Sequence, residues 1–107
     1  PLPRDPRALA FARRLLAEPG DPASLADLAR DAGASLRTLQ RLFLKEAGLP
    51  LEAWRARARM QQGVVALSAG ASVTEAGLQA GYQSASAFIA AFRRAYGVTP
   101  ARWRGAS

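Results

Sequence analysis

The sequence predicts an all-α chain of about seven helices, and three observations lead to this prediction. Alanine, leucine and arginine are abundant while β-branched residues are sparse, a composition that favours helix over strand. No segment alternates apolar and polar residues with period two, as a half-buried strand does. Serine and glycine stand at the ends of several apolar stretches, where they are typical helix caps.

In the first half of the chain, the sequence predicts three helices, each with a typical N-terminal cap and a residue that ends it. Asp5, Ser24 and Ser35 are residue types that cap helix N-termini, and a proline or glycine follows each apolar stretch. The three helices are expected at residues 6–17, 25–32 and 36–47.

The second half predicts one long helix and three shorter ones. The long helix contains Gly63, which lowers its helix propensity without ending it. Ser72 and Glu75 form a capping box, and Thr99-Pro100 is typical of a final short helix. These helices are expected at residues 51–69, 72–80, 84–96 and from residue 100 onward.

The chain also copies itself at a period of about 49 residues, which predicts two structural copies. The matching pairs are Ser24 and Ser72, Gly33 and Gly81, Ser35 and Ser84, Leu39 and Phe88, Phe43 and Phe92, Gly48 and Gly97, and Trp54-Arg55 and Trp103-Arg104. In each copy a short capped helix, a turn with a glycine and a second helix follow one another, which is the helix-turn-helix arrangement. We therefore expect helix-turn-helix subdomains at residues 1–50 and 71–107.

A linker helix at residues 51–70 is expected to join the two subdomains. At 1.5 Å per residue it would span roughly 28 Å. Two recognition helices on one face of DNA lie one helical turn apart, roughly 34 Å, so the linker has the right order of length.

The charge of the chain is positive and uneven. It has 15 basic and 8 acidic residues, for a formal net charge of +7. Residues 53–107 hold seven arginines and one acidic residue, Glu75. Arginine suits bidentate contacts with phosphate and guanine, so the charge favours a nucleic-acid partner. The alternative is a charge that merely keeps the chain soluble.

Several classes of function find no support in the composition. The chain has no histidine and no cysteine, and it has no phosphate-binding loop, so we expect no catalytic residues, no metal site and no cofactor. No apolar run approaches the ~20 residues of a membrane span, and we see no signal peptide, so the expected compartment is the cytoplasm. Because the chain begins at Pro1 rather than Met, we expect a piece of a longer protein.

The repeated motifs resemble a known family. They are Ser24-Leu25-x-x-Leu28-Ala29, Ser35-x3-Leu39-x-Arg41-x-Phe43, Gly48, Ser72-Val73-x-Glu75, Gly81-Tyr82, Phe88-x3-Phe92 and Gly97-Val98-Thr99-Pro100-x-x-Trp103-Arg104. Through them, residues 24–104 resemble the DNA-binding domain of the AraC-type (AraC/XylS) transcription regulators. Residues 86–94 are similar to the branch that often carries a cupin-type domain ahead of this one.

The resemblance implies sequence-specific binding of double-stranded DNA and regulation of transcription by a bacterial regulator. It implies seven helices, with two recognition helices in adjacent major grooves. It also implies an effector or dimerisation domain elsewhere in the full-length chain, and activation through RNA polymerase. Two alternatives remain open: a helical protein-interaction module, and a non-specific DNA-binding domain attached to another activity such as repair.

The sequence departs from the family pattern at two places. Ala76 and Gly77 replace a bulky aliphatic residue and an alanine, so the fifth helix is expected to be less well packed and less rigid. Ala90 stands where the family often has arginine, which puts base reading by the second subdomain in doubt.

In the first subdomain, Arg37, Gln40 and Arg41 share one face of the second helix and are the candidates for base contacts. Ser35 and Thr38, at the start of that helix, are candidates for phosphate contacts. The alternative for Arg37 and Arg41 is a solvated side chain or a contact with phosphate alone, and Arg41 could instead brace the fold.

In the second subdomain, the corresponding face is mostly small and apolar, which suits thymine methyl groups but not hydrogen-bonded discrimination. Its base-contact candidates are Gln83, Ala85, Ser86 and Ala90, next to Ile89, and its phosphate-contact candidates are Ser84, Arg93 and Arg94. We therefore expect this subdomain to anchor DNA more than it reads it. The alternative for Arg93 and Arg94 is a solvated face.

Trp54 and Trp103 hold equivalent places in the repeat. Either could stack on single-stranded bases. The favoured interpretation is that each tryptophan packs the helix that follows its subdomain onto that subdomain.

Overall fold

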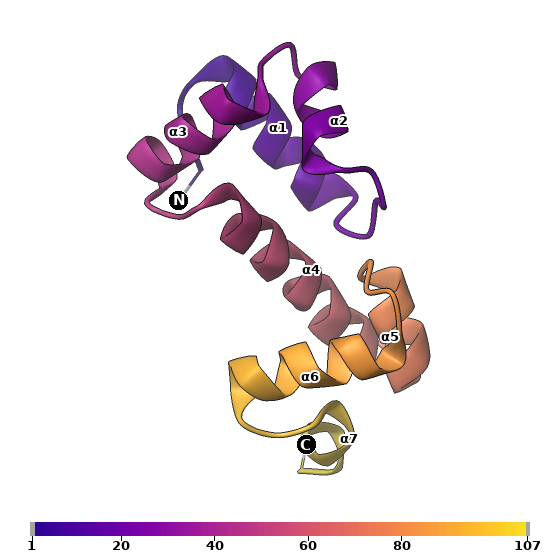
Figure 1. The fold of residues 1–107 in the computed structure, drawn as a ribbon. Coiled ribbons are helices and arrows are strands. Elements are labelled where there is room, and N and C mark those ends of the chain that lie inside the picture. Colours follow the sequence, from indigo (N-terminus) through magenta and orange to yellow (C-terminus); the bar gives the residue numbers. More distant parts are fainter. Residues whose placement is uncertain (1, 107) are drawn as a thin grey trace. The chain divides into compact units, whose positions relative to one another are not determined.

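A computed structural model of the chain describes residues 2–106, which form seven α-helices and no strand (Figure 1). The helices are α1 (Pro6–Ala17), α2 (Leu25–Asp31), α3 (Leu36–Ala47), α4 (Leu51–Ser68), α5 (Val73–Gln79), α6 (Ala85–Tyr96) and α7 (Pro100–Ala106). The predicted all-α fold is confirmed, and the helix ends lie within one residue of their expected positions. Within the described residues, no helix is long and apolar enough to cross a membrane.

The helices begin where the sequence provides caps. The Ser24, Ser35 and Ser84 hydroxyls each accept a hydrogen bond from the backbone N–H three residues later, at 3.1 Å in all three cases. At α5, Ser72 and Glu75 close both halves of a capping box. These bonds satisfy N–H groups that a helix cannot satisfy internally, so the starts are fixed by local sequence.

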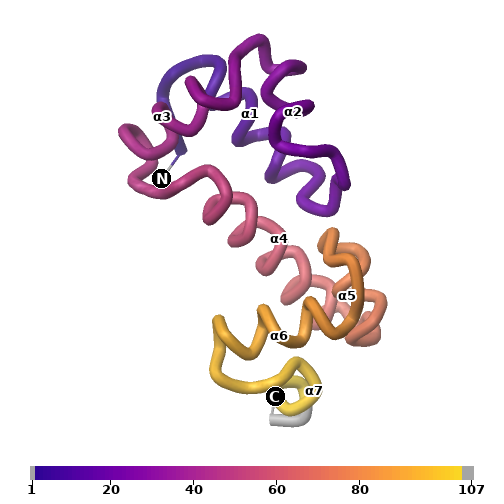
Figure 2. Tube along the Cα trace, viewed as in Figure 1, coloured from indigo at the N-terminus to yellow at the C-terminus, as the bar shows by residue number. Residues whose placement is uncertain are grey.

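The described chain divides into two compact units, Pro1–Ala58 (unit 1) and Arg59–Ser107 (unit 2). The boundary falls within α4. Figure 2 shows the same course in both units, with a short helix, a tight turn and a longer helix: α2 and α3 in unit 1, α5 and α6 in unit 2. The repeat in the sequence therefore corresponds to a repeat of structure.

Each unit has its own apolar core. In unit 1, Phe43 is buried and makes edge-to-face contacts with Phe11 and Trp54, at 5.8 and 5.6 Å between ring centres. In unit 2, Phe92 meets Trp103 in the same way at 5.9 Å. Both tryptophans pack against their cores, so the packing interpretation is confirmed.

The arginine after each tryptophan braces its unit. Arg55 Nη2 donates to the carbonyl oxygens of Asp21 and Ala23 at 2.6 and 2.7 Å, in the loop before α2. Arg104 Nη2 donates to the carbonyls of Leu67 and Ala71, in the equivalent place before α5. The repeated Trp-Arg pair is therefore a structural element in both units.

The expectation of a loosely packed α5 is wrong. Gly77 is buried, and a Cβ added there would lie 2.8 Å from the Cβ of Phe88 on α6. Because such a contact is too close, the glycine is what allows α5 to approach α6 at this point. Gly77 lowers the helix propensity of α5, but it also allows α5 and α6 to pack more closely.

Candidate nucleic-acid interface

The second helix of the helix-turn-helix in unit 1, α3, has one buried face and one polar face. Leu39 and Phe43 are buried in the core. On the other side, Arg37 and Arg41 are exposed and Gln40 is partly exposed. Positions 37, 40 and 41 are neighbours on a helix surface, so the structure brings the three predicted base-contacting residues together.

The start of α3 is held by its own hydroxyl groups. Ser35 Oγ donates to Thr38 Oγ1 at 2.9 Å and accepts from the Thr38 backbone N–H at 3.1 Å. The Ser35 hydroxyl therefore donates to Thr38, which leaves the hydroxyl proton of Thr38 available to another acceptor. Both predicted phosphate-contacting residues lie at the N-terminal end of α3, which favours an anion.

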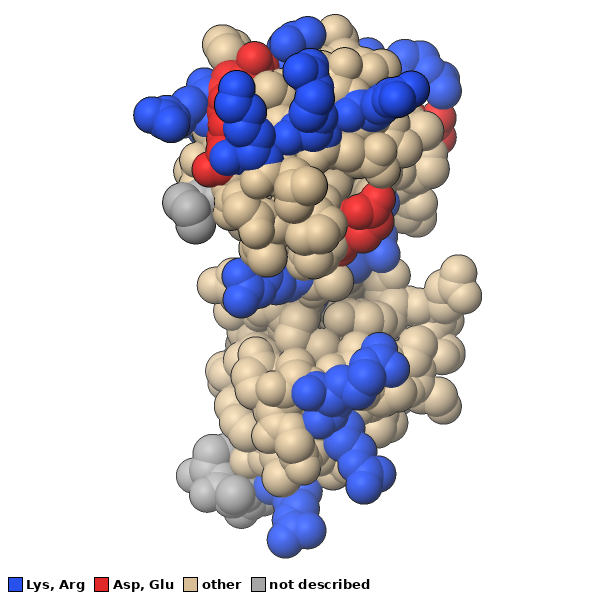
Figure 3. Space-filling model, turned by 60° about the vertical axis from the view of Figure 1, so that its left-hand side comes forward, with Lys and Arg blue, Asp and Glu red and all other residues tan. Residues whose placement is uncertain are grey.

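Three arginines on α1 and α2 are paired with carboxylates, whereas the cations of α3 are not, in the part of the chain that the structure describes. Arg7, Arg14 and Arg30, on α1 and α2, form ion pairs with aspartates, at N–O distances of 2.8–3.7 Å. Across residues 2–106, no ion pair involves Arg37, Arg41 or Lys45 of α3. Lys and Arg side chains stand side by side on the face of unit 1 seen in Figure 3, and a second group lies on unit 2. Positive charge that no carboxylate neutralises is what attracts a phosphate backbone.

Gln40 has a hydrogen-bond partner that was not predicted from the sequence. Its Nε2 donates to Glu52 Oε1, in the first turn of α4, at 3.0 Å. The repeat held a signal for this pair, because the counterparts of Gln40 and Glu52 in unit 2 are Ile89 and Ala101. Both residues change together between the copies.

In unit 2, the corresponding part of α6 presents smaller and less polar side chains than α3. Gln83, Ser84, Ser86 and Ala90 are exposed, and Ala85 is partly exposed. Ser84 caps α6 through the Ala87 N–H, which leaves its own hydroxyl proton available. The predicted residues of this unit therefore share one accessible end and face of α6.

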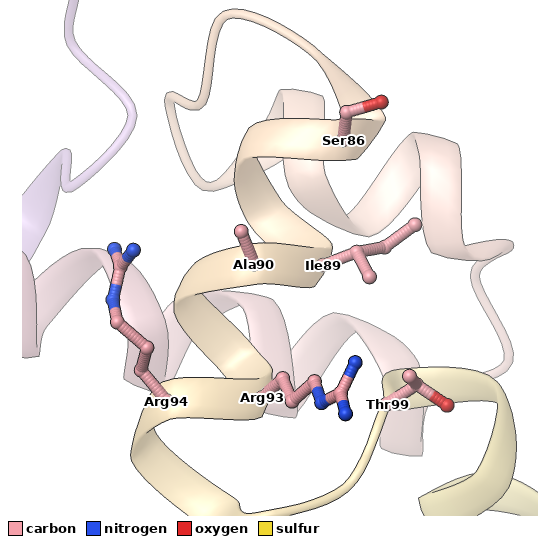
Figure 4. A pocket seen from close by; sticks show the side chains of 6 residues that line it. All are labelled: Ser86, Ile89, Ala90, Arg93, Arg94 and Thr99. Atoms are coloured by element: carbon pink, nitrogen blue, oxygen red, sulfur yellow. The ribbon is translucent and has the colours of Figure 1, made fainter.

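An open hollow lies on this face of α6. Its lining residues are Ser86, Ile89, Ala90, Arg93, Arg94 and Thr99 (Figure 4). The two arginines extend away from each other, with Arg93 directed toward Thr99. Thr99 was not among the contact residues predicted from the sequence. It reaches the hollow because α7 packs against α6, and its Oγ1 accepts from the Arg102 N–H at 3.3 Å.

Tyr82 supports the turn before α6. Its ring is partly buried and lies 5.3 Å from the ring of Phe88. Burial raises the pKa of the Tyr82 phenol above its ordinary value, while the nearby charges of Arg59 and Arg94 oppose the shift. The phenol therefore stays neutral at physiological pH and adds no negative charge to this surface.

The two recognition surfaces offer different chemistry at equivalent positions. Arg37, Gln40 and Arg41 correspond to Ser86, Ile89 and Ala90 in the repeat. Arginine and glutamine can each form paired hydrogen bonds with a purine edge in the major groove, whereas isoleucine and alanine can only contact thymine methyl groups. Unit 1 therefore presents hydrogen-bonding side chains at these positions, whereas unit 2 presents small and apolar ones with two arginines further along α6.

Comparison with known proteins agrees with this geometry. A family model described as a helix-turn-helix domain matches residues 28–106. The chain is 38% identical over 100 residues to the HTH-type transcriptional regulator RipA of Corynebacterium glutamicum, covering 94% of this chain and 30% of that protein. It is 36% identical over 69 residues to the HTH-type transcriptional regulator NimR of Escherichia coli, covering 64% of this chain and 25% of that protein. The chain thus spans less than a third of the length of either relative.

Solved structures give the same result. The DNA-binding domain of AdpA, crystallised with a target DNA, superposes with a TM-score of 0.86 at 30% identity, covering 96% of this chain and 93% of that one. A transcriptional regulator with an AraC-type DNA-binding domain from Chromobacterium violaceum superposes with a TM-score of 0.83 at 26% identity, covering 94% and 90%.

Proposed function

The chain belongs to the AraC-type family of helix-turn-helix DNA-binding domains, and from this premise we propose that it is the DNA-reading part of a bacterial transcription regulator. The observation that carries the proposal is the face of α3. There, Arg37, Gln40 and Arg41 lie together, and no carboxylate forms an ion pair with the two arginines among the described residues. The AdpA domain, which shares this fold, was crystallised with a target DNA, and this supports duplex DNA as the partner.

In the proposed complex, α3 reads bases. Arg37 and Arg41 contact guanine O6 and N7, and Gln40 contacts adenine N6 and N7. Ser35 and Thr38 contact a phosphate at the start of the helix. These roles follow from the exposure of the side chains and from the donors and acceptors that each one carries.

The proposed role of α6 is mainly to anchor. Ser84, Arg93 and Arg94 contact phosphates, because they offer donors around the accessible face of the helix. Gln83, Ala85, Ser86 and Ala90 lie against base edges and contribute weak discrimination. Base changes beneath α6 are therefore expected to reduce affinity less than base changes beneath α3.

The proposal extends to the whole regulator. Residues 1–50 and 71–107 act as the two DNA-binding subdomains, and residues 51–70 act as the helix between them. An effector or dimerisation domain lies elsewhere in the longer protein, as the partial coverage of the relatives favours. The regulator acts on chromosomal DNA in the cytoplasm, contacts RNA polymerase and catalyses no reaction.

Selection from a randomised duplex library tests this function. The 107-residue chain is incubated with the library at moderate salt, and the bound duplexes are sequenced over several rounds. A recovered motif supports sequence-specific binding, with a strongly preferred block beneath α3 and a weaker block about one helical turn away. Salt-sensitive retention without a motif would replace the proposal with non-specific DNA binding. No retention at low salt would favour a protein-interaction module.

A further inference from the structure

Gln40 is the residue of α3 whose base preference depends on how its amide is turned. We infer that Glu52 is a positioning residue that commits Gln40 to adenine rather than guanine. The inference rests on the proposed function, since it concerns how the same helix reads DNA. Its basis is the 3.0 Å hydrogen bond from Gln40 Nε2 to Glu52 Oε1 within unit 1.

The chemistry of the pair fixes the amide. An ionised carboxylate can only accept hydrogen bonds, so the amide atom that faces Glu52 is the nitrogen and not the oxygen. Glu52 lies in the first turn of α4, directly after the turn that follows α3. With Nε2 held on that side, the carbonyl oxygen Oε1 of Gln40 is turned away from Glu52.

This arrangement leaves Gln40 with one N–H and one carbonyl oxygen for DNA. Adenine presents an acceptor and a donor, N7 and the N6 amino group, which match that pair. Guanine presents two acceptors, O6 and N7, and a glutamine can satisfy both only with two N–H groups. Because Glu52 occupies one N–H, the arrangement that suits guanine is lost while the one that suits adenine remains.

The repeat provides an independent observation. Unit 2 has Ile89 at the position of Gln40 and Ala101 at the position of Glu52. The copy that lacks the reading amide also lacks the carboxylate beside it. Ala101 is exposed, like Glu52, so burial does not explain the difference between the two positions.

The test uses the duplex recovered by selection, with each base pair changed in turn. Comparing the wild-type chain with Gln40→Ala identifies the position at which Gln40 reads, because the preference there disappears in the variant. At that position, competition titrations measure the ratio of affinities for adenine and guanine. For Glu52→Ala, this ratio is expected to fall on the order of tenfold. For Glu52→Gln, whose Oε1 still accepts from Gln40, most of the preference is retained.

Two further readouts separate positioning from other roles. Removing a negative charge should raise the affinity for all duplexes in both Glu52 variants. A change in overall affinity with an unchanged adenine-to-guanine ratio would therefore reflect charge alone. Thermal unfolding reports any loss of stability, and a variant that melts earlier with an unchanged adenine-to-guanine ratio would show a purely structural bond.

The inference is overturned by an unchanged ratio in Glu52→Ala, by a guanine preference at the Gln40 position, or by equal loss in Glu52→Ala and Glu52→Gln. In each case the selected motif itself would leave the proposed function standing. A wild-type chain that selects no sequence would overturn both.

Discussion

Arg37 and Ser86 occupy equivalent places on the second helices of their units, as do Arg41 and Ala90. On α3 these positions carry long cationic side chains that have no ion pair among the described residues. On α6 the equivalent positions carry small side chains, and the basic residues of the helix are Arg93 and Arg94, in its last turn. At the residue scale, the duplicated framework carries different side chains at equivalent positions, and the proposed function assigns base reading mainly to unit 1.

Arginine substitutions should separate these two kinds of contact. Arg37→Ala is expected to reduce binding to the selected duplex by about 1–3 kcal/mol and to relax the preference at one base pair. Arg94→Ala is expected to weaken binding to all duplexes alike and to reduce the slope of log K against log salt by about one. Anisotropy titrations at several salt concentrations measure both effects.

Arg30→Ala is the matched control, because Arg30 is already paired with Asp27 at 3.0 Å on α2. It should leave the base preference unchanged. If Arg37→Ala and Arg94→Ala lowered affinity uniformly and to the same extent, the division of roles between α3 and α6 would be wrong.

Much of this surface was predictable from sequence, and its fine geometry was not. Helical periodicity was enough to place Arg37 and Arg41 on the accessible face of α3. The bond between Gln40 and Glu52 depends on how the turn between α3 and α4 brings two helices together, and periodicity carries no such information. Thr99 was missed for the same reason, since its place follows from the packing of α7 on α6.

At the scale of elements, the C-terminal end of α3 is hydrogen-bonded to the residues that precede α1. Glu46, in the last turn of α3, accepts hydrogen bonds from the backbone N–H groups of Arg4 and Asp5 at 2.7 and 2.8 Å. These bonds hold the residues before α1 against the C-terminal end of α3, and the neighbouring Pro3 is buried. The N–H donors of Asp5 and Arg4 lower the pKa of the Glu46 carboxyl below its ordinary value of 4.5.

The lowered pKa of Glu46 predicts a pH-dependent stability. A carboxyl whose pKa is depressed by folding stabilises the fold above its unfolded pKa, and this contribution is lost as the pH falls through the folded value. Glu46→Gln should therefore melt earlier than the wild type at neutral pH, and the difference should shrink below about pH 4.5. Thermal unfolding followed between pH 7 and pH 3 measures the effect.

Glu18→Gln serves as the comparison, because Glu18 is exposed and, among residues 2–106, no backbone N–H donates to its carboxylate as Arg4 and Asp5 do to Glu46. It should show little change in melting temperature at any pH. A constant difference between Glu46→Gln and the wild type across the whole range would contradict the role assigned to the ionised carboxylate.

The contact between α5 and α6 gives a prediction opposite to that of helix propensity. Alanine in place of a helical glycine ordinarily gains about 1 kcal/mol. At Gly77 the new Cβ would lie 2.8 Å from the Cβ of Phe88, an atom fixed to the backbone of α6, and such overpacking costs about 1–3 kcal/mol. Gly77→Ala is therefore expected to lower the melting temperature of the chain.

Thr74→Ala introduces the same residue at an exposed position of the same helix and should change stability by no more than about 0.5 kcal/mol. A higher melting temperature for Gly77→Ala would show that α5 and α6 can separate at little cost. The prediction of a loosely packed α5 was wrong because helix propensity is a local quantity, whereas the space at Gly77 is set by Phe88, which is distant in the sequence.

At the scale of the whole molecule, the chain is two units with separate cores, each built around a phenylalanine and a tryptophan in edge-to-face contact. The repeat predicted this organisation because equivalent core positions recur with the same residue types. The caps and glycines predicted the helix ends, since both act through the nearest few residues. In the proposed function, one chain binds duplex DNA through α3 and α6 together.

A hydroxyl-radical footprint of the chain on its selected duplex tests that claim most directly, combined with a measurement of how many chains bind each duplex. One chain per duplex should protect two stretches on the same face of the DNA, about one helical turn apart. The stretch beneath α6 should be protected even where substitution of its base pairs leaves the affinity unchanged. Protection of a single stretch by one chain, or two stretches that require two chains, would contradict it.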